Sequence, residues 1–127
     1  MNTLLYERGA QSWAQWTNDA AVASRICELC DVERIPSTLV HEGGGASLNG
    51  AGVVLLTETV QLDPGRNPPP ATRLSVEQEL KRTLGVSRCV WLARGLTRDY
   101  AEFGTRGHVD MIACFANEKT STVVVSI

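Results

Sequence analysis

Residues 46–57, with the sequence ASLNGAGVVLLT, decide the fold of this chain of 127 residues. The first four alternate between apolar and polar side chains, which is typical of a strand with one buried face. The dipeptide Asn49-Gly50 is a strong signal for a β-hairpin turn. Residues 52–57 follow as a nearly continuous apolar run, the kind that is buried on both faces of a sheet. The stretch therefore predicts a hairpin whose second strand lies inside the domain.

A helix is predicted before the hairpin, over residues 18–30. Alanine, valine, isoleucine, leucine and cysteine recur there at helical spacings. Trp13 and Trp16, three residues apart, suit one face of a helix start. The N-cap candidates are Thr17, Asn18 and Asp19. Pro36 prevents the helix from continuing into the next segment.

A second helix is predicted after the hairpin. It follows a proline-rich loop over residues 61–73 and has Ser75 as its N-cap. Gly85 ends it, because glycine readily adopts the left-handed conformation that closes many helices. Its predicted apolar positions are Leu74, Val76, Leu80 and Leu84.

Four further strands are predicted, at residues 37–40, 89–92, 108–115 and 120–127. The order is helix, strand, hairpin, helix, strand and strand pair. This order predicts a mixed α/β fold without the regular alternation of a doubly wound sheet. The last strand is apolar and β-branched and needs a neighbour. That neighbour would come from this chain, from a second subunit or from a segment that is missing.

The composition excludes several classes of function. The chain is 43 % apolar with a formal net charge of -2, which suits one globular domain or a piece of one. Acidic and basic residues are interspersed without a basic run, so we expect no nucleic-acid partner. No apolar run approaches the roughly 20 residues that span a bilayer. The N-terminus lacks the features of a secretory signal, so we expect a cytoplasmic protein without membrane association.

The chain has four cysteines: Cys27, Cys30, Cys89 and Cys114. Cys27 and Cys30 form a CxxC motif inside the first predicted helix, and no second pair or suitably spaced histidine completes a zinc site. We expect structural roles, because free cysteine is among the most buried residue types. A redox role of the pair is the alternative.

Three ionisable residues are the candidates for a functional site: Glu42, His108 and Asp110. In a strand, His108 and Asp110 would leave the same face because they are two residues apart. A histidine can act as general acid and base near neutral pH, and an aspartate can bind a guanidinium group bidentately. Glu42 precedes glycines that let the backbone approach a ligand, and it would fix the tautomer of the imidazole. The alternative is that all three are surface groups at strand ends.

Five segments in this order resemble the agmatine deiminase family, whose members are related to the Porphyromonas-type peptidylarginine deiminases. The segments are residues 42–44, 55–59, 66–68, 90–96 and 107–110. The similarity runs from about Trp13 to the last strand, which is nearly the whole chain.

The resemblance implies the pentein fold, in which ββαβ modules form an α/β propeller, with about two modules in a single partial domain over residues 1–127. It implies hydrolysis of agmatine to N-carbamoylputrescine and ammonia, a step of putrescine biosynthesis, without metal or organic cofactor. His108 would be the general acid and base, Glu42 would orient it, and Asp110 would hold the guanidinium group of the substrate.

Two groups of the family have no counterpart in residues 1–127. One is the nucleophilic cysteine of a glycine-rich segment near the family's C-terminus, and the other is a second guanidinium-binding aspartate. We therefore expect a truncated homologue that is inactive alone. Cys114 is a poor substitute, since a strand would put it about 13 Å beyond Asp110. The alternatives are a guanidinium-binding or homo-oligomerising module without catalysis, or an unstable fragment.

Three other residues are predicted to have structural roles. Trp91 and Phe115 are expected in the core as large aromatic side chains. Arg66, which precedes Asn67 and a proline, is expected to fix a loop.

Overall fold

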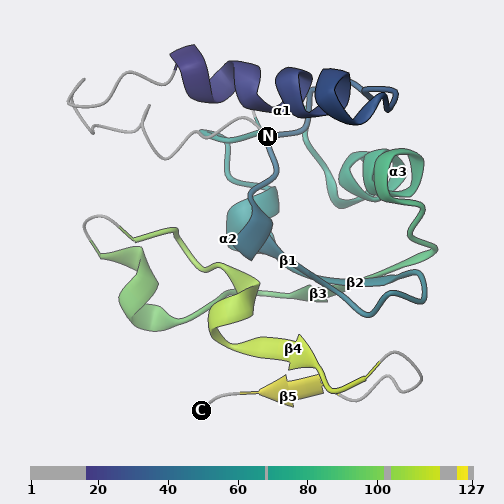
Figure 1. Ribbon diagram of the computed structural model, residues 1–127. Helices are drawn as coiled ribbons and strands as arrows, with labels where there is room; N and C mark the ends of the chain where they lie inside the picture. Colours follow the sequence, from purple (N-terminus) through teal and green to yellow (C-terminus); the bar gives the residue numbers. More distant parts are fainter. Residues whose placement is uncertain (1–16, 68, 102–103, 118–122, 126–127) are drawn as a thin grey trace.

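The computed structural model describes residues 17–67, 69–101, 104–117 and 123–125 (Figure 1). The helices are α1 (Thr17–Cys30), α2 (Glu58–Gln61) and α3 (Arg73–Leu84), and the strands are β1 (Ala46–Leu48), β2 (Val53–Thr57), β3 (Arg88–Leu92), β4 (Ala113–Phe115) and β5 (Val123–Val125). Three short 3₁₀ turns in this part of the chain are Gly43–Gly45, Thr97–Tyr100 and Val109–Met111. The prediction of a mixed α/β fold is confirmed. The predicted helical face at Trp13 and Trp16 lies outside the described residues.

The predicted hairpin forms as expected. β1 pairs antiparallel with β2, with Ser47 opposite Leu55. The side chain of Asn49 closes the turn by accepting the N–H groups of Ala51 at 2.8 Å and Val53 at 2.9 Å. β3 lies on the other side of β2 and runs parallel to it, so the sheet has the order β1-β2-β3.

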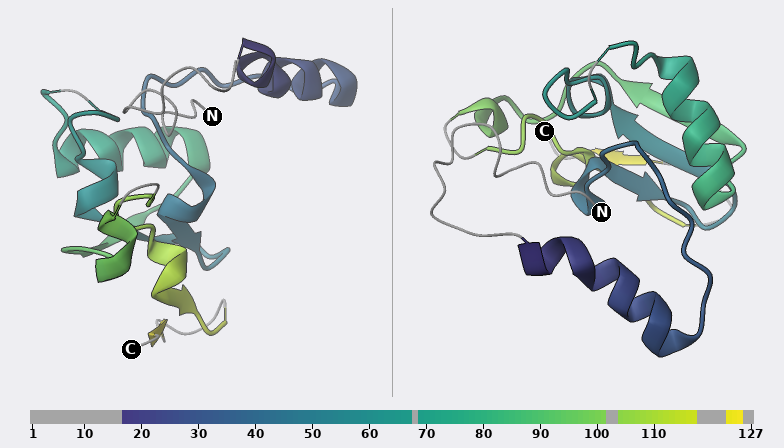
Figure 2. Two further views of the ribbon diagram at one scale, coloured as in Figure 1. Left: turned by 90° about the vertical axis from the view of Figure 1, so that its left-hand side faces the viewer. Right: turned by 90° about the horizontal axis from the view of Figure 1, so that it is seen from above.

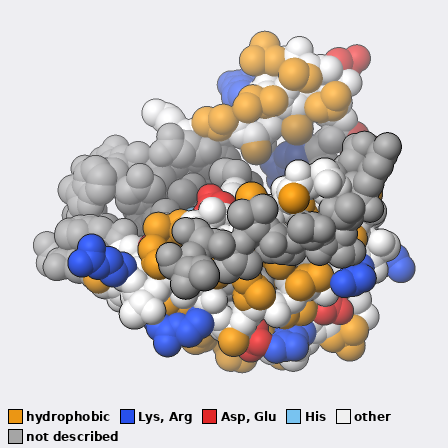
Figure 3. Space-filling model, turned by 90° about the horizontal axis from the view of Figure 1, so that it is seen from below, with side chains coloured by type: hydrophobic (Ala, Val, Ile, Leu, Met, Phe, Trp, Pro, Cys, Tyr) orange, Lys and Arg blue, Asp and Glu red, His pale blue; other side chains and the backbone are white. Residues whose placement is uncertain are grey.

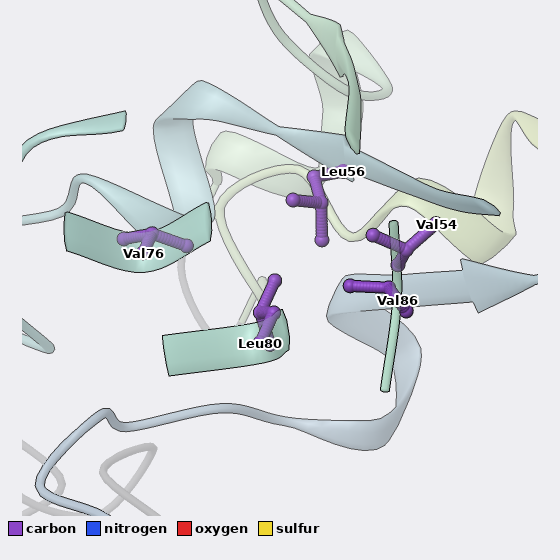
Figure 4. Packing of buried hydrophobic residues seen from close by; sticks show 5 residues of the cluster. All are labelled: Val54, Leu56, Val76, Leu80 and Val86. Atoms are coloured by element: carbon purple, nitrogen blue, oxygen red, sulfur yellow. The ribbon is translucent and has the colours of Figure 1, made fainter. Parts of the chain in front are cut away.

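The central strand β2 is buried on both faces. On one face, side chains of β2 pack against α3 and the turn that follows it (Figure 4), and this cluster comprises Val54, Leu56, Val76, Leu80 and Val86. On the other face, Leu55 packs against Val109 and Ala113, which lie just before and in β4. Figure 1 shows α3 on one side of the sheet and β4 and β5 on the other. Trp91 and Phe115 are partly buried against the two clusters, in agreement with the prediction of core aromatics.

The start of α3 corrects one prediction. Thr72, not Ser75, is the N-cap, and the two residues form a reciprocal capping box in which each side chain accepts the other's backbone N–H. Gly85 ends the helix as predicted, with φ +68°. Two of the four predicted apolar positions are exposed, Leu74 and Leu84. The helix is therefore held to the sheet by a narrow apolar stripe.

The segment before the candidate site is not a strand, although residues 37–40 were predicted to be one. Val40 makes its backbone hydrogen bonds with a side chain: its N–H donates to Asn67 Oδ1 at 2.8 Å, and its carbonyl accepts from Asn67 Nδ2 at 3.1 Å. A neighbouring strand has no groups left to pair with at that residue. The segment from Pro36 to Glu42 has no regular secondary structure and bends at Leu39, and it delivers Glu42 to the body of the molecule.

The predicted strand over residues 108–115 is also wrong in its first half. Residues Val109–Met111 form a 3₁₀ turn, and the strand β4 is limited to Ala113–Phe115. Side chains occupy the backbone groups just before this turn, as when the Thr57 hydroxyl donates to the Gly107 carbonyl at 2.6 Å. A ladder therefore cannot begin at His108.

The last strand finds its neighbour within the chain. β5 pairs antiparallel with β4, and residues 120–122 and 126–127 of the predicted strand lie outside the described part. The elements β1, β2, α3 and β3 make one ββαβ unit, and β4 and β5 are a further strand pair after it. This arrangement agrees with the repeated modules that the resemblance implies.

Helix α1 extends over the predicted range but stands off the body of the molecule (Figure 2). Several of its apolar side chains are exposed, with Ile26 at 52 % and Leu29 at 85 %. The space-filling view from below shows hydrophobic side chains on the surface formed by α1, at its top (Figure 3). Neither α1 nor another helix in the described ranges is long and apolar enough to cross a membrane.

Candidate active site

The candidate site is built around a hydrogen bond between Glu42 and His108. His108 Nε2 lies 2.5 Å from Glu42 Oε2, and the two residues are 9 % and 4 % exposed. Burial opposes ionisation of Glu42, but hydrogen bonds and positive charge from His108 and Arg66 outweigh it and lower the pKa of Glu42. An ionised carboxylate only accepts hydrogen bonds, so His108 carries a proton on Nε2. Two of the three predicted site residues, 66 positions apart in sequence, therefore meet directly.

Arg66 is part of this site, which the sequence prediction of a loop-fixing role did not include. Its Nη2 donates to Glu42 Oε2 at 2.9 Å and to the Thr105 carbonyl at 2.7 Å, and its Nη1 donates to Asp63 Oδ2 at 3.0 Å. The guanidinium thus ties the Glu42 segment to the loop that leads to His108. His108 and Arg66 both bond to Oε2 of Glu42. The other oxygen, Oε1, is buried and has no hydrogen-bond partner among the described residues.

Asp110 joins the site across Gly44. A Cβ atom at Gly44 would lie 2.7 Å from Asp110 Oδ2 and closer still to His108 Nδ1. The two side chains therefore converge on the same side of Gly44, although a 3₁₀ turn and not a strand brings them there. Asp110 is exposed, in contrast to the other two predicted site residues. An imidazole nitrogen and an accessible carboxylate side by side are suited to a cationic ligand that exchanges protons.

Asp99 is a second residue that sequence reasoning missed. It is buried in the turn Thr97–Tyr100, and its carboxylate accepts the backbone N–H groups of Gly107 at 2.7 Å and His108 at 3.1 Å. Burial opposes its ionisation, but these hydrogen bonds and those from Thr105 prevail and lower the pKa of Asp99. The sequence contains no signal for this role, because an aspartate in a polar loop is usually exposed.

The turn Gly43–Gly45 is held by His41 and Gln61. Gln61, which is fully buried, donates to the Gly45 carbonyl at 3.1 Å, and its Oε1 lies 3.1 Å from His41 Nδ1. Burial lowers the pKa of His41, with the Gln61 hydrogen bond and Glu42 acting against it. His41 is therefore a neutral side chain near neutral pH that fastens the glycine turn beside Glu42.

The four cysteines are distributed away from these contacts. Cys30 and Cys114 are exposed, so burial, the reason given for predicting a structural role, does not apply to them. Cys30 lies on α1, which does not pack closely against the body. Cys89 packs on the α3 side of the sheet, and burial, with the charge of Glu77, raises the pKa of its thiol. A raised pKa disfavours the thiolate that a nucleophile needs.

Besides these features, the chain is similar in sequence to known proteins over most of its length. The family model of the Porphyromonas-type peptidyl-arginine deiminases matches residues 6–127. The chain belongs to this family. The predicted pentein type of mixed α/β fold is confirmed, since its structural relatives include a putative agmatine deiminase and the putative arginine deiminase from Porphyromonas gingivalis.

Among individual relatives, the chain is 52 % identical over 110 residues to a putative agmatine deiminase of Streptomyces avermitilis, an alignment that covers 85 % of this chain and 32 % of that protein. It is 40 % identical to the agmatine deiminase of Medicago truncatula over 81 % of this chain and 26 % of the relative. The solved agmatine deiminase of Enterococcus faecalis superposes with a TM-score of 0.70 at 38 % identity, over 81 % of this chain and 27 % of that structure. The chain thus spans a third or less of the length of these relatives.

Proposed function

We propose that this chain carries the acid–base and carboxylate half of an agmatine deiminase site. The complete reaction hydrolyses agmatine with water to N-carbamoylputrescine and ammonia. The observation that carries the proposal is the buried His108–Glu42 hydrogen bond with Asp110 beside it, in a chain of this family. Family membership supports the hydrolase class, and the roles of the individual residues are part of the proposal.

His108 is the proposed general acid and base. Its Nε2 is occupied by Glu42, so its Nδ1, which lies on the side of Gly44 and Asp110, is the nitrogen that faces a ligand. There it would take a proton from the attacking group and then give that proton to the leaving ammonia. Glu42 orients the ring and holds the tautomer.

Asp110 is the proposed guanidinium-binding group. A guanidinium is planar and forms paired hydrogen bonds with a carboxylate, and the exposed carboxylate of Asp110 is accessible for them. Glu42 Oε1 supports the same ligand chemistry, because it is a buried acceptor without a partner in the described part of the chain. Agmatine or a similar small guanidinium compound is the proposed partner.

The isolated chain of 127 residues is proposed to bind such a ligand without turning it over. The family resemblance assigns the attack to a cysteine of a glycine-rich segment that has no counterpart in residues 1–127. A substitute is disfavoured because Cys27 and Cys30 lie on α1, which stands off the body, and because the pKa of the Cys89 thiol is raised. The chain would represent a single partial domain of a cytoplasmic enzyme of putrescine formation.

A non-catalytic module that forms homo-oligomers is the second candidate. The exposed apolar side chains of α1 favour it. Val22 is 49 %, Ile26 52 % and Leu29 85 % exposed. The last strand was expected to need a neighbour, which a second subunit could have supplied. It pairs with β4 of the same chain. Light scattering tests the candidate directly: a stable dimer or larger species supports it, and a monomer at all concentrations rejects it.

Calorimetric titration with agmatine tests the main proposal. The parent chain should bind, Asp110→Ala should bind at least tenfold more weakly, and Glu33→Ala should bind like the parent. Glu33 is the control because it is an exposed acidic residue that follows α1 and precedes Pro36. An ammonia assay on the same samples should stay at background. No binding by the folded parent contradicts the guanidinium site, and ammonia release contradicts the inactivity of the isolated chain.

A further inference from the structure

A single buried carboxylate holds the main chain that leads into His108. Asp99 is 7 % exposed. Its Oδ1 accepts the N–H of Thr105 at 2.7 Å, and its Oδ2 accepts those of Gly107 at 2.7 Å and His108 at 3.1 Å. The Thr105 hydroxyl also donates to Oδ2. One side chain therefore binds the backbone at three of the residues from 105 to 108.

The peptide before His108 is held from its other side as well. The Thr57 hydroxyl donates to the Gly107 carbonyl at 2.6 Å. Gly107 has φ +106°, and a Cβ atom there would collide with the hydroxyl oxygen of Tyr100. Since Asp99 fixes its N–H and Thr57 fixes its C=O, this peptide has one orientation in the fold.

Only an ionised carboxylate satisfies these partners. Neighbouring backbone N–H groups in a turn form a concave site for an anion, and Asp99 fills it from within the chain. Thr105, Gly107 and His108 all present donors to it. An asparagine would direct an NH₂ group at one of these donors and leave it unpaired. The hydrogen bonds lower the pKa of Asp99 despite its burial, so the carboxylate stays charged near neutral pH.

Fixing the backbone of His108 also fixes the start of its side chain. The imidazole then has Nε2 at 2.5 Å from Glu42 Oε2 and Nδ1 on the side of Gly44, in space that a Cβ atom at Gly44 would occupy. A small displacement of the main chain would break the hydrogen bond to Glu42. Site geometry must be kept within about 0.5 Å for function, and supporting hydrogen bonds provide that precision.

We infer that Asp99 is a positioning residue for His108: its carboxylate binds the N–H groups of Gly107 and His108 and thereby sets the hydrogen bond between His108 and Glu42. The importance of this bond for a guanidinium ligand rests on the proposed function. The alternative is that Asp99 stabilises the loop without any effect on the imidazole.

Nuclear magnetic resonance on the ¹⁵N-labelled full chain separates the two possibilities. Three samples are compared at pH 7.5: the parent, Asp99→Asn, and Arg98→Ala as a control from the same turn with an exposed side chain. The first readout is the hydrogen exchange of the Gly107 and His108 amides. The second is the pair of ring-nitrogen chemical shifts of His108, which report its tautomer. The third is agmatine affinity by calorimetry.

In the parent and in Arg98→Ala, His108 should show one tautomer with its proton on Nε2. In Asp99→Asn, the two amides should exchange at least tenfold faster, the ring nitrogens should move toward averaged tautomer values, and agmatine should bind at least tenfold more weakly. Faster amide exchange with unchanged His108 shifts would overturn the inference and leave Asp99 as a loop stabiliser. If the parent binds no agmatine, the proposed function fails, while the tautomer readout still decides the role of Asp99.

A milder variant covers the case in which Asp99→Asn does not fold. Thr105→Val removes the hydroxyl that donates to Asp99 and accepts the His108 N–H at 3.3 Å, and it keeps the carboxylate with its three backbone partners. It should shift the His108 ring nitrogens in the same direction by a smaller amount. A folded Thr105→Val chain with parental ring shifts and faster exchange of the two amides would contradict the inference.

Discussion

The candidate site and helix α1 use their side chains in opposite ways. Around Glu42 and His108, charged groups are buried and bonded to one another, and the bonds join segments that are far apart in sequence. On α1, apolar side chains such as Ile26 and Leu29 face solvent, and the Arg25–Glu28 ion pair is local and exposed. The site is therefore assembled by the sheet, α3 and the loops around them, without a contribution from the described residues of α1. The geometry of the site should therefore be insensitive to changes in α1.

The largest expected contrast is between two arginines. Arg66→Met removes a buried partner that Glu42 and Asp63 share, and taking one member out of a buried ion-pair network should cost about 3–5 kcal/mol of unfolding free energy. Arg25→Met on α1 breaks a pair whose side chains are 75 % and 62 % exposed and should cost less than about 0.5 kcal/mol. Urea denaturation measures both. Equal losses would contradict the contrast between the two regions.

The apolar counterpart compares Leu80 in α3 with Ile26 in α1. Leu80 is 1 % exposed in the cluster that joins α3 to β2, whereas Ile26 is 52 % exposed. Leu80→Ala should lower stability by about 3 kcal/mol through lost burial and the cavity that remains. Ile26→Ala should cost about 1 kcal/mol or less, because only part of its surface is removed from water. A larger loss for Ile26 would mean that α1 packs against the body more closely than described.

The smallest expected effect is the pH dependence of stability that comes from residues at the candidate site. The pKa of His41 is lowered in the fold, so the unfolded chain binds a proton first as the pH falls below about 6.5, and stability decreases. The pKa values of Glu42 and Asp99 are also lowered, and their contribution is lost only at lower pH, below about 4.3. His41→Gln should reduce the slope of stability between pH 5 and 6.5 and keep the steeper loss in acid. An unchanged slope would show that His41 does not contribute it.

The sequence predicted those parts of the fold that depend on local pattern. The hairpin at Asn49-Gly50, the doubly buried strand β2 and the range of α1 followed from periodicity and turn chemistry. The strand predictions failed where side chains take the place of a partner strand. Asn67 bonds to the backbone of Val40, and Thr57 and Asp99 bond to the carbonyl and the N–H of Gly107. Such contacts join distant segments and leave no periodic trace.

Three residues of the candidate site were predicted from the sequence. Glu42, His108 and Asp110 were chosen by residue type and by the family resemblance, and the structure brings them together. Arg66 and Asp99 complete the buried part of the site, yet each is a charged residue in a loop, and that type is usually exposed. Only the folded contacts distinguish a buried bracing residue from a solvated one.

The most direct test of the central claim maps where agmatine binds. The ligand is titrated into ¹⁵N-labelled chain, and the backbone amide shifts are followed residue by residue. The account predicts shifts in the turn Gly43–Gly45 and in residues 107–111, with α1 unchanged. Shifts confined to the pocket formed by α1 and the residues just after it, which Ser24, Cys27, Asp31 and Arg34 line, or no shifts at all in a folded chain, would contradict it.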